Sequence, residues 1–268
     1  MSSRLRAIAR DTLAIIDRGF YDGAAGPVAI GTAVARAVGA TRLYLPDDPL
    51  PAPAATDGPP AVEVTNESSL SATRRLAATG DVACLVFASA RNPGGGFTNG
   101  AQAQEESLAR GSALYPCLTA CPEFYAWHRA HAELTYSDRV IYSPHVPVFR
   151  DDDGRVLPTT YPVSFLTAAA PNLGAIQRSQ KELEAEVPGV LRRRAGRVLD
   201  IAAAHGHRRL VLGAWGCGVF GNDPGTVARA FAEQLGTARG FTRVVFAVLD
   251  RQRFVPTYTV FRRLTTGA

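Results

Sequence analysis

Two adjacent glutamates, Glu105 and Glu106, follow Gln104 at the start of a segment whose pattern predicts a helix. Consecutive helical residues point about 100° apart, because an α-helix has about 3.6 residues per turn. The two carboxylates therefore cannot face each other across one bond, as the pair in a standard glycosidase does. One can reach a scissile glycosidic bond while the other holds a neighbouring hydroxyl group. The simplest matching chemistry uses one acid, which protonates the leaving oxygen and then deprotonates the incoming water.

The position of Glu106 in a first helical turn has two opposing consequences. The helix dipole favours the ionised carboxylate, and acidic residues are common in first turns for that reason alone. A bound diphosphate and a second carboxylate nearby favour the protonated form instead. We therefore expect Glu106 to become a competent acid mainly when substrate is bound. The alternative is that both glutamates only complement the helix dipole.

A glycine-rich stretch, RNPGGGFTNGAQA, stands just before these acids, and we call residues 91–103 the first glycine segment. Gly94, Gly95 and Gly96 have no side chains, so their backbone can approach a ligand closely and adopt positive φ. Free N–H groups at the start of the following helix favour an anion. No GK[ST] sequence follows, which excludes a Walker A loop. The alternative is a tight turn from a strand into a helix.

A second stretch, LGAWGCGVFGND, is called here the second glycine segment (212–223). Three of its glycines have the G-x-G-x-x-G spacing of dinucleotide-binding loops: Gly216, Gly218 and Gly221. A nicotinamide cofactor is disfavoured, because the acid that ends the next strand, Asp250, lies further away than the usual distance of about 20 residues. The backbone amides of 216–221 are instead predicted to form a nest for a phosphate or diphosphate. Trp215 is predicted to pack beneath it, and a packing turn is the alternative for the whole segment.

Strand and helix patterns alternate around both glycine segments. Continuous apolar runs at 81–90, 208–216 and 242–250 are typical of strands buried on both faces. Further strands are predicted at 62–66, 139–149 and 161–171, and helices at 69–79, 101–115, 176–205 and 224–236. This order predicts an α/β fold with a mostly parallel sheet flanked by helices. Ligands bind such sheets at the carboxyl ends of the strands, where both glycine segments fall.

Residues 1–60 are predicted to form an N-terminal helical extension and linker, and residues 61–268 a catalytic domain. The extension has helical patterns at 3–18 and 28–39, then a short apolar run at 42–45. A Pro- and Ala-rich stretch, 46–60, reads as an extended linker.

Composition narrows the function classes. The 268 residues are 46% hydrophobic, enough for a full core, and the net charge of +5 permits an anionic substrate without proving one. No apolar run reaches the roughly 18 residues that span a membrane, and no signal peptide is evident. A cytoplasmic location and four reduced cysteines are therefore expected. The histidines at 128, 131, 205 and 207 lack a metal-binding pattern, so no metal is expected.

The two glycine segments together resemble those of a known enzyme family. GGG, seven residues (FTNGAQA) and QEE are similar to the signature of the poly(ADP-ribose) glycohydrolases, and the flanking FASARN and SLARGSALY resemble the microbial type. GAWGCGVFGND is similar to the family's diphosphate loop. The resemblance implies a macrodomain-like fold that binds ADP-ribose and hydrolyses the ribose–ribose O-glycosidic bonds of poly(ADP-ribose). It further implies a cofactor-free monomer that acts on ADP-ribosylated proteins in the DNA damage response.

The resemblance also implies roles for individual residues. Glu106 is the general acid and base, and Glu105 holds a ribose hydroxyl at the scissile linkage. Phe220 packs on the terminal ribose, and Asn222 fixes its loop or contacts the ligand. The remaining substrate-binding residues implied by position are Gly94, Gly95, Gly96, Asn99, Gln104, Gly216, Cys217, Gly218 and Val219.

The sequence does not decide which residues contact the distal ribose and the adenine. Many macrodomains end the strand before the glycine loop with an asparagine that contacts the distal ribose, but here Ser89, Asn92 and Asn99 are all candidates. Phe254 and Tyr161 are candidates to stack on adenine, with core packing as the alternative for each. Cleavage at chain ends or within chains is also left open, although capping of the terminal ribose by the N-terminal extension is thought to occur in the microbial type.

Two other functions compete with hydrolysis. A non-catalytic ADP-ribose reader on the same fold needs no paired glutamates behind the glycine segment, and this sequence has them. A nicotinamide-dependent oxidoreductase would use Gly216 to Gly221 and would bind NADH in preference to ADP-ribose.

Overall fold

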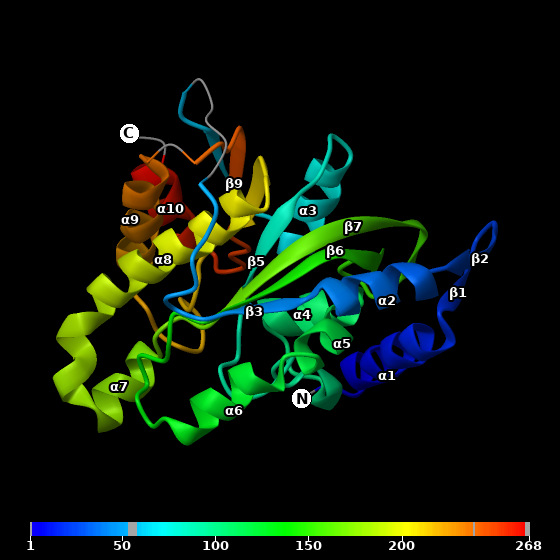
Figure 1. Cartoon of the computed structure of the whole chain (residues 1–268), viewed down its shortest axis with the longest axis horizontal. Coiled ribbons are helices and arrows are strands. Elements are labelled where there is room, and N and C mark those ends of the chain that lie inside the picture. The colour runs from blue at the N-terminus through cyan, green and yellow to red at the C-terminus, as the bar shows by residue number, and fades with distance from the viewer. Residues whose placement is uncertain (1, 53–57, 238, 266–268) are drawn as a thin grey trace.

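The computed structural model describes residues 2–52, 58–237 and 239–265, and it is built around a seven-stranded sheet (Figure 1). The strand order across the sheet is β3–β6–β7–β5–β8–β9–β4. The bounds in chain order are β3 (Arg42–Tyr44), β4 (Ala61–Thr65), β5 (Ala83–Phe87), β6 (Val140–Arg150), β7 (Val156–Ala168), β8 (Arg209–Leu212) and β9 (Arg243–Ala247). Strands β7, β5, β8, β9 and β4 run parallel, whereas β6 is antiparallel to both of its neighbours. The predicted mostly parallel α/β sheet is confirmed.

Helices cover both faces of this sheet (Figure 1). One face carries α1 (Ser3–Arg18), α2 (Gly31–Ala40), α3 (Ser69–Ala77), α4 (Gln104–Gly111), α5 (Leu114–Thr119) and α6 (Pro122–Ala130). The other carries α7 (Leu173–Ser179), α8 (Val187–Ala204), α9 (Pro224–Leu235) and α10 (Pro256–Thr265). Two 3-10 turns, η1 (Phe97–Asn99) and η2 (Lys181–Glu186), precede α4 and α8. None of the helices in these described ranges is long and apolar enough to cross a membrane.

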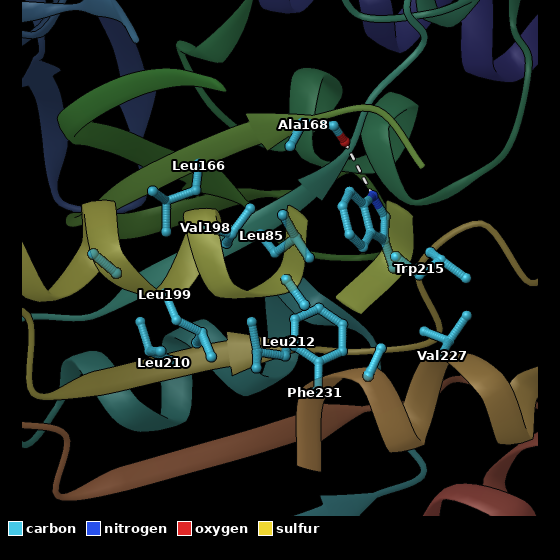
Figure 2. Close-up of a cluster of buried hydrophobic side chains, with 14 of the residues drawn as sticks. Leu85, Leu166, Ala168, Val198, Leu199, Leu210, Leu212, Trp215, Val227 and Phe231 are labelled. Carbon is cyan, nitrogen blue, oxygen red and sulfur yellow. Dashed lines mark hydrogen bonds between the residues drawn. The ribbon is translucent and has the colours of Figure 1, made fainter. Parts of the chain in front are cut away.

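The central strands supply side chains to both layers. On β5, Leu85 faces α8 and α9, whereas Cys84 and Val86 face the opposite layer, as the two-residue period of a strand requires. Figure 2 shows the α8–α9 layer, in which Phe231 packs close to Trp215. The indole Nε1 of Trp215 donates a hydrogen bond of 3.0 Å to the carbonyl oxygen of Ala168 (Figure 2).

Trp215 is buried, which confirms that it packs beneath the second glycine segment. Its hydrogen bond to Ala168 ties the start of that segment to the end of β7. The buried indole of Trp215 therefore fixes the start of the second glycine segment against β7.

The N-terminal extension packs against the rest of the chain at several places. Strand β3 pairs with β6 and so belongs to the main sheet. Helix α1 lies against α4, where the Thr12 hydroxyl donates to the carbonyl oxygen of Arg110 at 2.7 Å. Arg150 donates to the same hydroxyl at 3.0 Å and pairs with Asp11.

Several predicted helices have different bounds in the structure. The pattern at 28–39 begins instead in a hairpin of β1 (Phe20–Gly23) and β2 (Gly26–Ala29), in which Gly26 pairs with Gly23 at a φ of 121°. The helix predicted at 101–115 is interrupted at Ser112, because this residue bridges to Val148 of β6.

The long helix predicted at 176–205 is three elements, since the chain turns between α7 and α8 through η2. Helix α10 was not predicted. The described part of the Pro-rich stretch 46–60 contains no helix or strand, and residues 53–57 of that prediction lie outside the described residues.

Candidate active site

A cavity of about 720 Å³ lies at the carboxyl ends of the parallel strands. The second glycine segment forms one wall through residues 216–220, and the first turn of α4 forms another through Ala103 and Gln104. Phe87 and Ala247, at the ends of β5 and β9, lie between these walls. The cavity occupies the position at which open α/β sheets bind ligands.

The two glycine segments converge because β5 and β8 are parallel neighbours, with Ala83 opposite Leu210. Both strands therefore end at the same edge of the sheet, and one segment follows each of them. The approach is close, since a Cβ atom added at Gly213 would lie 3.0 Å from the ring of Phe87. The two glycine segments thus lie side by side at one edge of the sheet, as the predicted site requires.

The carboxyl group of Glu106 is held by the first glycine segment. The backbone N–H of Gly96 donates to Glu106 Oε1 at 3.0 Å. A Cβ atom at Gly95 would collide with the same oxygen, and Gly95 has a φ of 57°. Glycine is therefore required at 95 for both its conformation and its close approach to the acid. No hydrogen bond to Oε2 of Glu106 occurs within the described residues, so this oxygen is free to meet a substrate.

Glu105 is more deeply placed than Glu106, with 3% of its surface exposed compared with 9%. Its Oε2 accepts from the Ser89 N–H at 2.6 Å, while its Oε1 is buried without a partner in the described chain. Burial raises the pKa of Glu105 well above its ordinary value, the Ser89 amide lowers it, and the charge of Glu106 raises it again. The environment thus favours a protonated Glu105, which can donate a hydrogen bond to a ligand hydroxyl.

Gln104 joins helix α4 to the sheet. Its Oε1 accepts from the Phe87 N–H at 2.9 Å, and its Nε2 donates to the Leu85 carbonyl at 2.7 Å and to the Ser69 hydroxyl at 3.1 Å. Although Gln104 lines the cavity, its amide is already engaged with β5 and α3. It fixes the first turn of α4, and with it the two glutamates.

The second glycine segment presents unused hydrogen-bond donors. In the described structure, the N–H groups of Gly218, Val219 and Phe220 donate to no protein acceptor. Val219 is 90% exposed at the tip of the segment. Neighbouring free amides in a concave turn form an anion-binding nest.

Asn222 braces this nest from behind. Its Nδ2 donates to the Pro171 carbonyl at 2.9 Å and to the Gly216 carbonyl at 3.3 Å, and its own N–H donates to the Gly216 carbonyl at 3.0 Å. Asn222 is buried, so it fixes the segment. A side chain at Gly216, where φ is 72°, would collide with Asn222.

Two other side chains of the second glycine segment border the cavity. The ring of Phe220 lies 6.0 Å from that of Tyr136. Burial, followed by the charge of Asp223, raises the pKa of the Cys217 thiol to about 12. This shift disfavours the thiolate form that a nucleophilic cysteine needs.

The alternatives for the distal-ribose contact separate in space. Ser89 lies against the Glu105 carboxyl group, whereas Asn92 is exposed and its N–H donates to the Ser89 hydroxyl at 3.2 Å. Asn99 is exposed on η1, and the next residue, Gly100, accepts from the Ser2 N–H of the extension.

The two candidates for adenine stacking also differ. Tyr161 packs against the core and donates to the Leu70 carbonyl at 3.1 Å. Phe254 is 78% exposed, so core packing is wrong for this residue. Neither residue lines the cavity.

The two glutamates do not themselves line the cavity, although Gln104 beside them does. The backbone of Gly95 lies against the carboxyl oxygens of both glutamates. Sequence patterns missed the third wall of the cavity, Leu249 to Gln252 after β9. Its position at the end of a predicted strand was a usable signal.

The histidines have partners within the protein. His128 contacts the Phe124 carbonyl at 2.8 Å and the Ser137 hydroxyl at 2.9 Å, and burial lowers its pKa to about 4. His205 and His207 each bond a tyrosine hydroxyl at 2.8 Å. The described ranges contain no group of three or more His, Cys, Asp or Glu placed to hold a metal ion.

The fold and the site together define a macrodomain-like enzyme, with an acidic helix start beside an anion-binding loop. The sequence model described as the catalytic domain of microbial-type poly(ADP-ribose) glycohydrolase (PARG) matches residues 9–151. The chain is 49% identical to PARG from Thermomonospora curvata, with a TM-score of 0.92 over 98% of this chain and 100% of that one. This chain belongs to the microbial-type PARG family.

Two ligand complexes are also similar to the chain. PARG from Thermomonospora curvata bound to the inhibitor ADP-HPD is 48% identical, with a TM-score of 0.87 over 98% of this chain and 99% of that one. PARG from Deinococcus radiodurans in complex with ADP-ribose is 46% identical, with a TM-score of 0.80 over 86% of this chain and 96% of that one. A comparison with curated protein sequences gave no match.

Proposed function

We propose that this chain hydrolyses the ribose–ribose O-glycosidic bonds of poly(ADP-ribose) and releases ADP-ribose, with Glu106 as general acid and base. The observation that carries the proposal is the hydrogen bond from Gly96 to Glu106, which fixes the acid beside a loop of free amide donors. Family membership supports the substrate, and the related complexes with ADP-ribose and ADP-HPD support ADP-ribose as a ligand.

The amides of Gly218, Val219 and Phe220 hold the substrate diphosphate in this mechanism. Phe220 packs on the terminal ribose and orients its anomeric carbon. Glu105 holds a ribose hydroxyl at the scissile linkage. The free amides of the nest and the buried position of Glu105 support these roles.

The proton is conserved through the reaction. Protonated Glu106 gives its proton to the glycosidic oxygen as the bond from this oxygen to the anomeric carbon breaks. The resulting sugar cation has oxocarbenium character, and the substrate's own diphosphate stabilises it. The Glu106 carboxylate then removes a proton from water, whose oxygen bonds to the anomeric carbon. ADP-ribose is released and the acid is restored.

Replacement of Glu106 tests the proposal. Glu106→Gln is expected to retain ADP-ribose binding in calorimetry and to lower turnover of poly(ADP-ribose) by at least about 10³-fold. Glu233→Gln, at an exposed glutamate of α9, is the matched control and should keep native turnover. Release of ADP-ribose at the native rate by Glu106→Gln would refute Glu106 as the general acid and base.

Residues 1–60 are proposed to act with a catalytic domain of residues 61–268. Leu5 and Ile8 of α1 line the cavity, which supports a direct part for the extension in substrate access. We also propose that the protein is a cytoplasmic monomer. It would act on ADP-ribosylated proteins in the DNA damage response. The four cysteines are free thiols, which fits a reducing compartment.

A further inference from the structure

Arg110 differs from the other buried arginines of the described chain. Three of these form ion pairs: Arg150 with Asp11, Arg194 with Asp138 and Arg239 with Asp200. Arg110 is 6% exposed, yet no carboxylate of the described residues lies within ion-pair distance of it. A buried charge without a counter-ion is costly, so its retention calls for a specific role.

The guanidinium group of Arg110 is linked to the acid through the first glycine segment. Its Nη1 donates to the Ala101 carbonyl at 2.6 Å. The Ala101 N–H donates to the Gly96 carbonyl at 3.1 Å, and the Gly96 N–H donates to Glu106 Oε1 at 3.0 Å. Glu106 and Arg110 are four residues apart on α4, which is about one helical turn. The three hydrogen bonds and this turn of helix therefore form a closed ring.

Helix α1 holds this arrangement from outside. The Thr12 hydroxyl donates to the Arg110 carbonyl at 2.7 Å, and the Ser2 N–H donates to the Gly100 carbonyl at 3.2 Å. The N-terminal extension therefore holds Arg110 and the residue that precedes Ala101. Within the closed ring, the Gly96 carbonyl also accepts from the Asn99 N–H at 3.0 Å, while the Ala101 carbonyl accepts from Arg110.

The charge of Arg110 also suits this position. Burial lowers the pKa of Arg110, and the neighbouring charge of Glu106 raises it. An arginine stays protonated even so, because its ordinary pKa is above about 12. A cation one turn away stabilises the carboxylate that Glu106 becomes after proton transfer.

We propose that Arg110 is a positioning residue for the hydrolytic reaction, which fixes the first glycine segment through Ala101 and thereby aims the Glu106 carboxyl group at the substrate. The inference rests on the proposed role of Glu106. Arg110 also borders the cavity, but its guanidinium group is engaged with the Ala101 carbonyl and the Ser107 hydroxyl, so it acts through the backbone and its charge.

The test compares Arg110→Met, Arg110→Lys and Arg239→Met in the full chain. Methionine has a similar length without charge or donors, and it is expected to lower kcat by about 100-fold, because small misplacements of a catalytic group have effects of this size. KM for poly(ADP-ribose) and the Kd for ADP-ribose should stay within about 3-fold of native. Arg110→Lys keeps a charged donor and should restore part of kcat.

Arg239→Met removes a buried arginine that pairs with Asp200 and is the matched control. It should lower the melting temperature and leave kcat unchanged, whereas Arg110→Met should melt within about 4 °C of the native protein.

Several results would overturn the inference. A raised KM with native kcat in Arg110→Met would make Arg110 a substrate-binding residue. Equal losses of kcat in Arg110→Met and Arg239→Met would reduce its role to general stability. If Arg110→Met does not fold, Arg110→Lys and Arg110→Gln replace it in the test. Native kcat in both of these variants would refute the positioning role of Arg110. Glu106→Gln measured in parallel separates the two hypotheses, because native turnover there refutes the role of Glu106 itself.

Discussion

The two glycine segments follow neighbouring parallel strands and border one site, yet they use their backbone amides in opposite ways. In the first, the amides of Gly95, Gly96 and Phe97 all donate to acceptors within the protein, and one of these is the Glu106 carboxylate. In the second, the amides of Gly218 and Val219, with that of Phe220, donate to nothing in the described chain.

This difference separates two tasks that similar sequences could perform. A segment whose donors are satisfied internally can hold a catalytic group in one position. A segment whose N–H groups are free can bind a ligand anion without rearrangement. Its amides form new hydrogen bonds to the anion and need not break existing ones. Glycine is needed in the first for closeness to the acid, and in the second for the turn that aims the amides outward.

The largest expected effect comes from a side chain in the first segment. Gly95→Ala would place a Cβ atom against Glu106 Oε1 and 3.2 Å from Glu105 Oε2, at a φ of 57°. We expect turnover to fall by about 100-fold, because the acid is displaced. The free energy of unfolding should fall by about 1–3 kcal/mol, because alanine is strained at positive φ. Steady-state kinetics and denaturant unfolding measure the two effects.

Gly218→Ala is the matched substitution in the second segment. A Cβ atom there meets no atom within 4 Å. The free energy of unfolding should change by no more than about 0.5 kcal/mol. If Gly218→Ala and Gly95→Ala destabilise the protein equally, the contrast between the two segments is wrong.

A smaller effect should follow loss of the brace behind the second segment. Asn222→Ala removes the hydrogen bonds to the carbonyls of Pro171 and Gly216. Unsatisfied carbonyls should lower the free energy of unfolding by about 1–3 kcal/mol. Misplaced amides should weaken ADP-ribose binding by about tenfold in calorimetry, which corresponds to about 1.4 kcal/mol.

Asp223→Ala controls for stability alone. Asp223 caps α9 by accepting from the Thr226 N–H at 2.7 Å, so its loss should cost about 0.5–2 kcal/mol. ADP-ribose affinity should stay near native in this variant. Equal losses of affinity in both variants would show that the nest depends on overall stability, with no special part for Asn222.

The smallest expected effect is a change of slope in the dependence of stability on pH. Burial raises the pKa of Glu105 in the native state above its ordinary value of 4.5. At a pH between 4.5 and this raised pKa, the native state therefore binds more protons than the unfolded state. The contribution of Glu105 to stability is therefore complete below pH 4.5 and is lost as the pH rises toward the raised value. Glu105→Gln cannot ionise, so its stability relative to the native protein should improve as the pH rises.

Unfolding in denaturant from about pH 4.5 upward measures this slope. Glu233→Gln serves again as the exposed control. Parallel curves for Glu105→Gln and the native protein would contradict the buried, protonated state of Glu105.

Local sequence determined the chemistry of the two segments. Runs of residues that are apolar throughout predict strands buried on both faces, and β5, β8 and β9 lie where such runs occur. Glycines at Gly94, Gly95 and Gly216 supply positive φ in turns whose sequence already demands it. The QEE motif at the start of a helix predicted two carboxylates that point apart, and α4 begins at Gln104. Each of these follows from interactions within a few residues of chain.

Tertiary structure alone decided which groups meet. Arg110 has no local signal that distinguishes it from Arg150 or Arg194, because its lack of a carboxylate partner depends on segments far away in the chain. The contact of Phe220 with Tyr136 and the third wall of the cavity are long-range contacts of the same kind. Burial then converts Glu105 from an ordinary acid into one that favours its proton, since desolvation depends on everything packed around it.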